Sequence, residues 1–219
     1  MLFTIPDLLS AEAVADLIAQ LEQADTVDGK TTAGWHAKTV KQNQQLDPKH
    51  PATAAMIDQV HQVTLKHPLF QSAARPRRIH TLRFNRYSDG MAYGRHTDSA
   101  LMSGFRSDLS FTLFLSDPDS YEGGELVVEG ADSEQAYKLQ AGSMLVYPSS
   151  SLHRVEPVVS GVRWAAIGWV QSQVRDPAAR EILFELDTAR RSLFAQYGKT
   201  DEFDLITKSL NNLVRRWVD

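Results

Sequence analysis

The chain has 219 residues, 42% of them hydrophobic and 23% charged, which is ordinary for a globular protein. The net charge of -4 gives no support to binding of nucleic acid, and the absence of cysteine excludes disulfides, thiolate metal sites and cysteine nucleophiles. Any metal must therefore be held by imidazole and carboxylate groups. The length suits one domain, or one domain with a helical appendage.

The N-terminus lacks the basic segment and long apolar run of a signal peptide, and no stretch stays apolar over about 18 residues. We therefore expect a cytoplasmic protein without membrane segments.

Two amphipathic helices are predicted first, over residues 10–24 with Ser10 as N-cap and over about 51–66 with Pro51 in the first turn. Between them, the segment AGWHAKTV (33–40) is a candidate strand.

From residue 77 to about 170 the pattern changes to short strands separated by glycine, proline and serine. RIHTLRFNRY (78–87) alternates, and DLSFTLFLS (108–116) is nearly all apolar, as in a strand buried on both sides. Four further strand-like segments follow: GGELVVEG, AYKLQAGSMLVYPS, LHRVEPVV and GVRWAAIGWVQS. Short strands at regular spacing favour a sandwich or a jelly roll.

From residue 176 onward the helical period returns in two segments. In the first segment, one face is predicted to carry Ile182, Leu186, Ala189 and Leu193. In the second, alternating spacings of three and four form a short heptad seam of Phe203, Ile206, Leu210, Leu213 and Trp217. A seam this short is more often intramolecular packing than a dimer interface, although self-association through these helices stays open.

A histidine and an aspartate stand one residue apart in YGRHTDSALM (93–102). His96 and Asp98 point to the same side if they lie on a strand or strand end, so both can reach one metal ion. The pair alone is a weak signal. A jelly roll that brings distant strands together would add His153, which lies after a turn in YPSSSLHRVEPV. Two histidines and one carboxylate form the facial triad suited to non-haem Fe(II) with open coordination positions.

Arg163 stands in the otherwise apolar strand GVRWAAIGWV, on the face shared with Ala165, Ile167 and Trp169. A buried arginine is costly unless its charge is paired. Either it binds a carboxylate of a small molecule, or it forms an internal salt bridge or faces solvent at a sheet edge. The strand alone leaves these readings open, and the three candidate ligands upstream favour the first.

Together, His96, Asp98, His153 and Arg163 resemble the site of the Fe(II)- and 2-oxoglutarate-dependent dioxygenases. More narrowly, RFNRYSDGMAYGRHTD, DLSFTLFLS, YEGGELVVEG, AGSMLVYPSSSLHRVEPV and GVRWAAIGWVQS resemble the PKHD-type hydroxylases, bacterial relatives of the prolyl 4-hydroxylase catalytic domain. The resemblance covers nearly the whole chain. It implies an α+β fold with a mainly β core: a double-stranded β-helix (jelly roll) flanked by N-terminal helices, with a helical C-terminal segment.

The same resemblance implies domain limits and a reaction. A dioxygenase domain would cover residues 1–175, with a helical part over 1–76 and the jelly-roll core over 77–175, and the helical segment would cover 176–219. Fe(II) would bind the triad, and 2-oxoglutarate would chelate the iron and pair its far carboxylate with Arg163. With O2, the reaction would yield succinate and CO2 and hydroxylate a substrate, while L-ascorbate keeps the iron reduced.

Around this site the resemblance leaves several residues open. Tyr87 would donate its hydroxyl to 2-oxoglutarate, or pack in the core with an incidental hydrogen bond; Tyr93 and Tyr147 are further candidates. Arg106 and Asp108 would meet substrate or, more simply, form a solvated surface pair. Gly168 departs from the family pattern, where a bulkier residue is expected at the pocket floor.

The sequence does not identify the prime substrate. The family name suggests prolyl or lysyl side chains, and an association of the group with bacterial iron uptake allows a small metabolite or a siderophore-like compound. One alternative is a non-catalytic sensor that binds iron and 2-oxoglutarate. Another is a cupin-like, non-oxidative metalloenzyme, which would not need Arg163.

Overall fold

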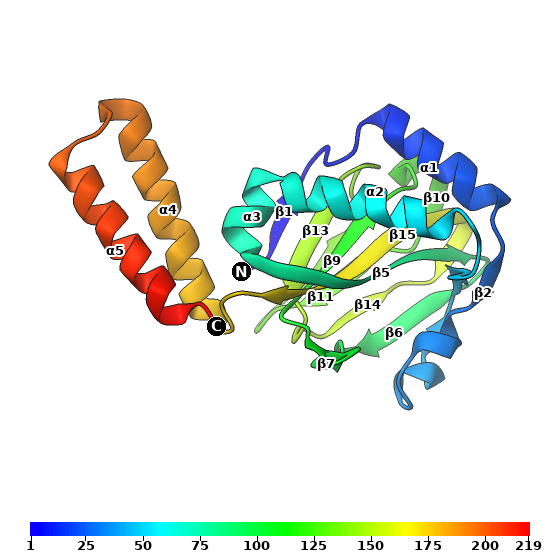
Figure 1. Cartoon of the computed structure of the whole chain (residues 1–219). Coiled ribbons are helices and arrows are strands. Elements are labelled where there is room, and N and C mark those ends of the chain that lie inside the picture. Colours follow the sequence, from blue (N-terminus) through cyan, green and yellow to red (C-terminus); the bar gives the residue numbers. More distant parts are fainter.

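The strands of the chain form two facing sheets, seen in Figure 1, in a computed structural model that describes residues 1–219. The larger, eight-stranded sheet has the order β1 (Phe3–Ile5), β13 (Met144–Pro148), β9 (Leu109–Phe114), β15 (Val158–Ser172), β5 (Pro76–Ser88), β4 (Gln44–Leu46) and β2 (Thr26–Asp28), with β10 (Tyr121–Gly123) paired to β15. The smaller sheet contains β12 (Glu134–Tyr137), β11 (Leu126–Glu129), β14 (His153–Val155), β6 (Ala92–His96) and β3 (Lys41–Gln42). A short pair, β7 (Leu101–Met102) and β8 (Phe105–Arg106), completes the strands.

Alternation along the strands of the larger sheet divides their side chains between two cores. In β13, Met144 and Val146 belong to an outer core shared with the helices, whereas Leu145 and Tyr147 belong to an inner core shared with the smaller sheet. Every residue of β9 is buried, which confirms the prediction of a strand covered on both sides. The inner core is therefore the layer in which a site can form between the sheets.

Three helices cover the outer face of the larger sheet (Figure 1): α1 (Ala11–Gln23), α2 (Thr53–Lys66) and α3 (Pro68–Ala74). The first two were predicted, and Ser10 caps α1 by accepting a hydrogen bond from the amide of Ala13 at 3.2 Å. Helix α3 was not predicted because seven residues are too few to display a helical period. None of the helices is long and apolar enough to cross a membrane.

The segment AGWHAKTV (33–40) is not the strand that its sequence suggested. Its residues 37–39 form a 3-10 turn, η2 (Ala37–Thr39), and β3 begins only at Lys41. A second 3-10 turn, η1 (Gly29–Thr32), precedes it. Most of this segment is exposed, with Trp35 at 86%, so its β-forming side chains have no sheet face to bury them.

The C-terminal helices α4 (Pro177–Tyr197) and α5 (Asp201–Trp217) form a hairpin beside the sheets (Figure 1). Leu210 and Leu213 of the predicted seam pack against Leu183 and Val174 in a small separate core, so this part of the seam packs within the chain. The prediction for the first helix was wrong at Ile182, which is 46% exposed, whereas Leu183 is fully buried. Helix α4 also contacts α3, and its buried residues are Ala179, Arg180, Leu183 and Asp187.

Candidate metal centre

The two candidate histidines meet across neighbouring strands. His96 at the end of β6 pairs directly with His153 at the start of β14, and their ring centroids lie 4.2 Å apart. Side chains opposite each other in an antiparallel pair lie on the same face of the sheet. Both histidines are buried, with 7% and 4% of their surface exposed. Strand register thus brings together two histidines that stand 57 positions apart in the sequence.

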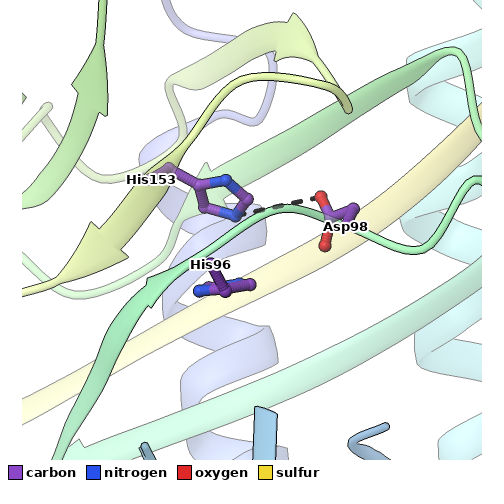
Figure 2. Close-up of side chains that lie close together, drawn as sticks. All are labelled: His96, Asp98 and His153. Atoms are coloured by element: carbon purple, nitrogen blue, oxygen red, sulfur yellow. Dashed lines mark ion pairs between the residues drawn. The ribbon is translucent and has the colours of Figure 1, made fainter. Parts of the chain in front are cut away.

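Asp98 reaches the histidines from the loop that follows β6, as Figure 2 shows. Its amide donates to the carbonyl of Ser149 at 3.3 Å, and its Oδ2 accepts a hydrogen bond from Ser110 Oγ at 2.6 Å. The same Oδ2 lies 3.8 Å from His153 Nε2. One ligand atom from each of the three residues lies within 4.8 Å of the others, so the structure brings the predicted triad together.

Hydrogen bonds fix the tautomer of both imidazoles. His96 Nδ1 lies 2.8 Å from the carbonyl oxygen of Gly94, and His153 Nδ1 lies 3.0 Å from that of Ser151. A carbonyl only accepts, so each Nδ1 carries a proton, and in the neutral form of each ring Nε2 has a lone pair for a metal. Burial lowers the pKa of His96 to about 4, which keeps that ring neutral. Two imidazoles and one carboxylate fit a divalent ion such as Fe(II).

Aromatic rings hold the imidazoles in place. Tyr93 stacks on His96 with 3.6 Å between ring centroids, and Tyr147 contacts His153 edge-on at 5.0 Å. Both tyrosines were candidates for contact with a co-substrate. The structure places them against the rings of the triad, where they restrict the orientation of the candidate ligands.

Arg163 is 2% exposed and lies in the inner core on β15. It forms no ion pair, and its Nε and Nη2 have no hydrogen-bond partner, so neither the internal salt bridge nor the solvent-exposed edge describes it. The guanidinium lies 5.3 Å from the ring of Tyr87 and 5.4 Å from that of Phe114. It lines the same cavity as the triad. A buried, unpaired cation beside a metal triad fits the second carboxylate of 2-oxoglutarate.

Tyr87 stands directly opposite Arg163 in the pairing of β5 with β15 and is 1% exposed. Burial raises the pKa of Tyr87 to about 12, so its hydroxyl remains protonated and able to donate at neutral pH. The residue also lines the cavity between Arg163 and the triad. Its position therefore suits a hydrogen bond to a carboxylate held by the guanidinium.

Ser110 is a residue of the site that the sequence interpretation missed. Besides its bond to Asp98, its hydroxyl lies 2.8 Å from Ser149 Oγ. The signal was present, because alternation along 109–114 turns Ser110 and Thr112 to the same face, and both line the cavity. Nothing in a single strand, however, shows that this face meets Asp98.

The structure corrects one further expectation and explains the departure at Gly168. Arg106 and Asp108 are not a solvated pair: they lie 2.7 Å apart, are mostly buried and bind the backbone of Ser172, so they fasten the end of β15. At Gly168, an added Cβ would come within 2.2 Å of Phe111 Cζ. The bulkier residue expected there is excluded because the ring of Phe111 occupies its space.

Residues 82–171 match the family model described as 2OG-Fe(II) oxygenase superfamily, and residues 178–219 match the PKHD-type hydroxylase C-terminal domain. The fold and the site thus belong to the class of iron- and 2-oxoglutarate-dependent oxygenases, which use Fe(II) as cofactor and O2 and 2-oxoglutarate as co-substrates.

The relatives narrow this class. A PKHD-type hydroxylase from Picosynechococcus sp. is 59% identical over 217 residues, covering 99% of each chain, and another from Acaryochloris marina is 58% identical over the full length of both. The chain belongs to the PKHD-type hydroxylases, and it is a 2-oxoglutarate-dependent hydroxylase.

Solved structures agree on the fold. A prolyl-4-hydroxylase from Pseudomonas putida is similar over 78% of this chain and 92% of its own, with a TM-score of 0.56 and 23% identity. HygX from Streptomyces hygroscopicus, solved with nickel and 2-oxoglutarate bound, is similar over 76% of this chain and 81% of its own, with a TM-score of 0.57 and 13% identity.

Proposed function

We propose that the chain hydroxylates a peptidyl side chain or a small metabolite, such as a compound of iron uptake, and releases succinate and CO2. His96, Asp98 and His153 would hold the iron through two Nε2 atoms and one carboxylate oxygen. Arg163 would bind the far carboxylate of 2-oxoglutarate, with Tyr87 as a further donor. When bound, the iron would supply O2 activation coupled to oxidative decarboxylation of 2-oxoglutarate.

The observation that carries this proposal is the unpaired guanidinium of Arg163. Leaving a buried charge without a partner costs several kcal/mol by order of magnitude, so a ligand carboxylate is the natural counter-charge. A non-oxidative cupin-like site would have no use for such a cation. The cavity between Arg163 and the triad is small, with a volume of about 40 Å³.

The other residues of the site prepare it for this ligand. Gly94 and Ser151 carbonyls hold the Nδ1 protons away from the metal position, and Ser110 fixes the carboxylate of Asp98. Aromatic and aliphatic residues line much of the cavity and exclude water, which strengthens the charge interactions inside it.

We also propose that the two facing sheets form a double-stranded β-helix over residues 77–175. In support, the inner core joins side chains of both sheets, and the solved relatives with this fold align over most of the chain. The separate core of the α4–α5 hairpin supports a boundary near residue 175, between a 1–175 domain and the 176–219 segment. Self-association through the hairpin remains a prediction.

Succinate release tests the proposed reaction. Purified protein with Fe(II), ascorbate and 2-oxoglutarate should form succinate slowly even without prime substrate. His96→Ala should abolish both iron binding and succinate formation, whereas His61→Ala on α2, away from the site, should change neither. Wild-type rates in the His96 variant would refute the ligand assignment, and iron and 2-oxoglutarate binding without succinate would indicate a sensor.

An untargeted search addresses the prime substrate. The loaded enzyme is incubated with cell extract, and peptides and metabolites are examined by mass spectrometry for a gain of one oxygen. Products that appear with the wild type and not with His96→Ala are candidates. If the gain falls only on peptides, the small-metabolite reading is wrong, and the reverse outcome excludes the peptidyl reading.

A further inference from the structure

A second, larger cavity adjoins the triad. It has a volume of about 250 Å³ and shares Tyr93, Asp98, Ile167 and Trp169 with the narrow cavity that contains Arg163. Its outer wall comes from the exposed segment around η1 and η2 and from residues 97–103. A molecule bound here would lie beside the metal position, with 2-oxoglutarate held separately at Arg163.

A buried lysine faces this second cavity. Lys41 is 3% exposed and stands opposite Tyr93 in the pairing of β3 with β6, with its Nζ 5.1 Å from the centroid of the tyrosine ring. Its Nζ donates to Thr32 Oγ1 at 3.3 Å, and it forms no ion pair with a carboxylate. A largely buried ammonium with one neutral acceptor is an incomplete arrangement.

The position of Lys41 is fixed by a chain of hydrogen bonds. Thr32 Oγ1 donates in turn to Gln45 Oε1 at 2.8 Å, and Gln45 Nε2 donates to Asn85 Oδ1 at 2.8 Å. Asn85 lines the cavity of Arg163. The ammonium is therefore held toward the cavity by the larger sheet and does not move freely like a surface lysine.

A second cation lies on another wall of the same cavity. Arg83, on β5, is half-buried, forms no ion pair, and has its guanidinium 5.7 Å from the ring of Trp169. Burial, followed by repulsion from Arg83, lowers the pKa of Lys41 to about 8. Two like charges therefore line one cavity without an ion pair to either, and the acid that lines the same cavity, Asp98, is assigned to the metal.

We propose that the prime substrate carries an oxyanion, a carboxylate or a phosphate, which binds between Lys41 and Arg83 beside the metal triad. The oxyanion would neutralise two repelling cations, and the planar guanidinium suits it geometrically. Trp169 lines the same cavity beside Arg83, so its indole resonance can report on an anion bound there. The assignment of this anion to the molecule that is hydroxylated rests on the proposed function. The binding of an anion between Lys41 and Arg83 does not depend on it.

Anion titration of the full chain tests the proposal. The protein is labelled with ¹⁵N in its tryptophan indoles and studied by NMR without added metal, so that no anion can coordinate an ion. Inorganic phosphate, acetate and neutral acetamide are titrated while the Trp169 resonance, assigned with Trp169→Phe, is followed. Phosphate or acetate should shift this resonance to saturation and acetamide should not; the tighter of the two anions identifies the group.

Variants locate the bound anion. Lys41→Met and Arg83→Met should each weaken anion binding at least about tenfold, Lys41→Arg should retain it, and Lys38→Met, on the exposed side of the same segment, should match wild type. The proposal is overturned if neither anion shifts Trp169 in the wild type. It is equally overturned if both methionine variants bind like wild type, since the anion would then lie at Arg163.

Two features keep this result separate from the proposed reaction. The resonances of the other tryptophans show whether each variant is folded. Because Arg83 is half-exposed, Arg83→Met is expected to fold, and it tests anion binding even if Lys41→Met fails to fold. Succinate formation is measured independently. Anion binding without succinate would reject the proposed function alone, and succinate formation without anion binding would reject the present inference alone.

Discussion

Replacing Arg163 with methionine should weaken 2-oxoglutarate binding and stabilise the free protein at the same time. Removing one partner of a buried, hydrogen-bonded charge pair costs about 2–5 kcal/mol, which corresponds to a Kd raised about 30-fold to about 5,000-fold. In the free protein, Nε and Nη2 of this residue are buried without partners, a cost of roughly 1–3 kcal/mol that an uncharged side chain of similar length removes.

The two effects have separate assays. Calorimetric titration of Zn(II)-loaded protein, which cannot turn over, gives the affinity for 2-oxoglutarate. Differential scanning calorimetry of the metal-free protein gives Tm, which should rise by about 2–4 °C per kcal/mol for a chain of this size. Arg154→Met is the matched control, because this partly exposed arginine pairs with Glu134 and Glu156 at the surface and should affect affinity very little.

Either of two outcomes would refute this reasoning. An unchanged Kd would show that the guanidinium does not bind the co-substrate. A Tm lowered by several degrees would show that Arg163 has an internal partner on which the fold depends.

Three further predictions concern neighbouring features. Ser110→Ala removes the 2.6 Å hydrogen bond to Asp98 and should lower iron affinity about 10- to 100-fold in a chelator competition. Gly168→Ala places a methyl group 2.2 Å from Phe111 and should cost about 1–3 kcal/mol in urea unfolding. Burial lowers the pKa of His80, so the unfolded chain binds the proton more readily, and the free energy of unfolding should decline as pH falls below about 6.5.

A matched control variant tests each of these three predictions. Ser110→Thr keeps the hydroxyl and should keep the iron affinity; equal affinity in the alanine variant would show that the bond is incidental. Gly168→Ala combined with Phe111→Leu should recover part of the lost stability. His80→Gln should flatten the decline of stability between neutral and mildly acidic pH, and parallel curves for this variant and wild type would contradict the assignment.

The chemistry of the site could be predicted from sequence because it depends on residue type and order. In a chain without cysteine, imidazole and carboxylate groups were the metal ligands to consider. Alternation along a strand predicted that His96 shares a face with Asp98, and that Arg163 shares a face with Trp169. Long periodic elements were predictable for the same reason, since burial of one face leaves a repeating pattern. Very short ones, such as β1 and α3, leave too few repeats to detect.

What surrounds those side chains was decided only by the tertiary structure. Strand register brings Ser110 to Asp98, leaves Arg163 without a partner, and sets Lys41 of the smaller sheet across a cavity from Arg83 of the larger one. A slip of one residue in any of these strands would turn the same side chains to the opposite face. Pairing between distant strands is a property of the whole fold, so no local pattern could reveal which charges would face each other unpaired.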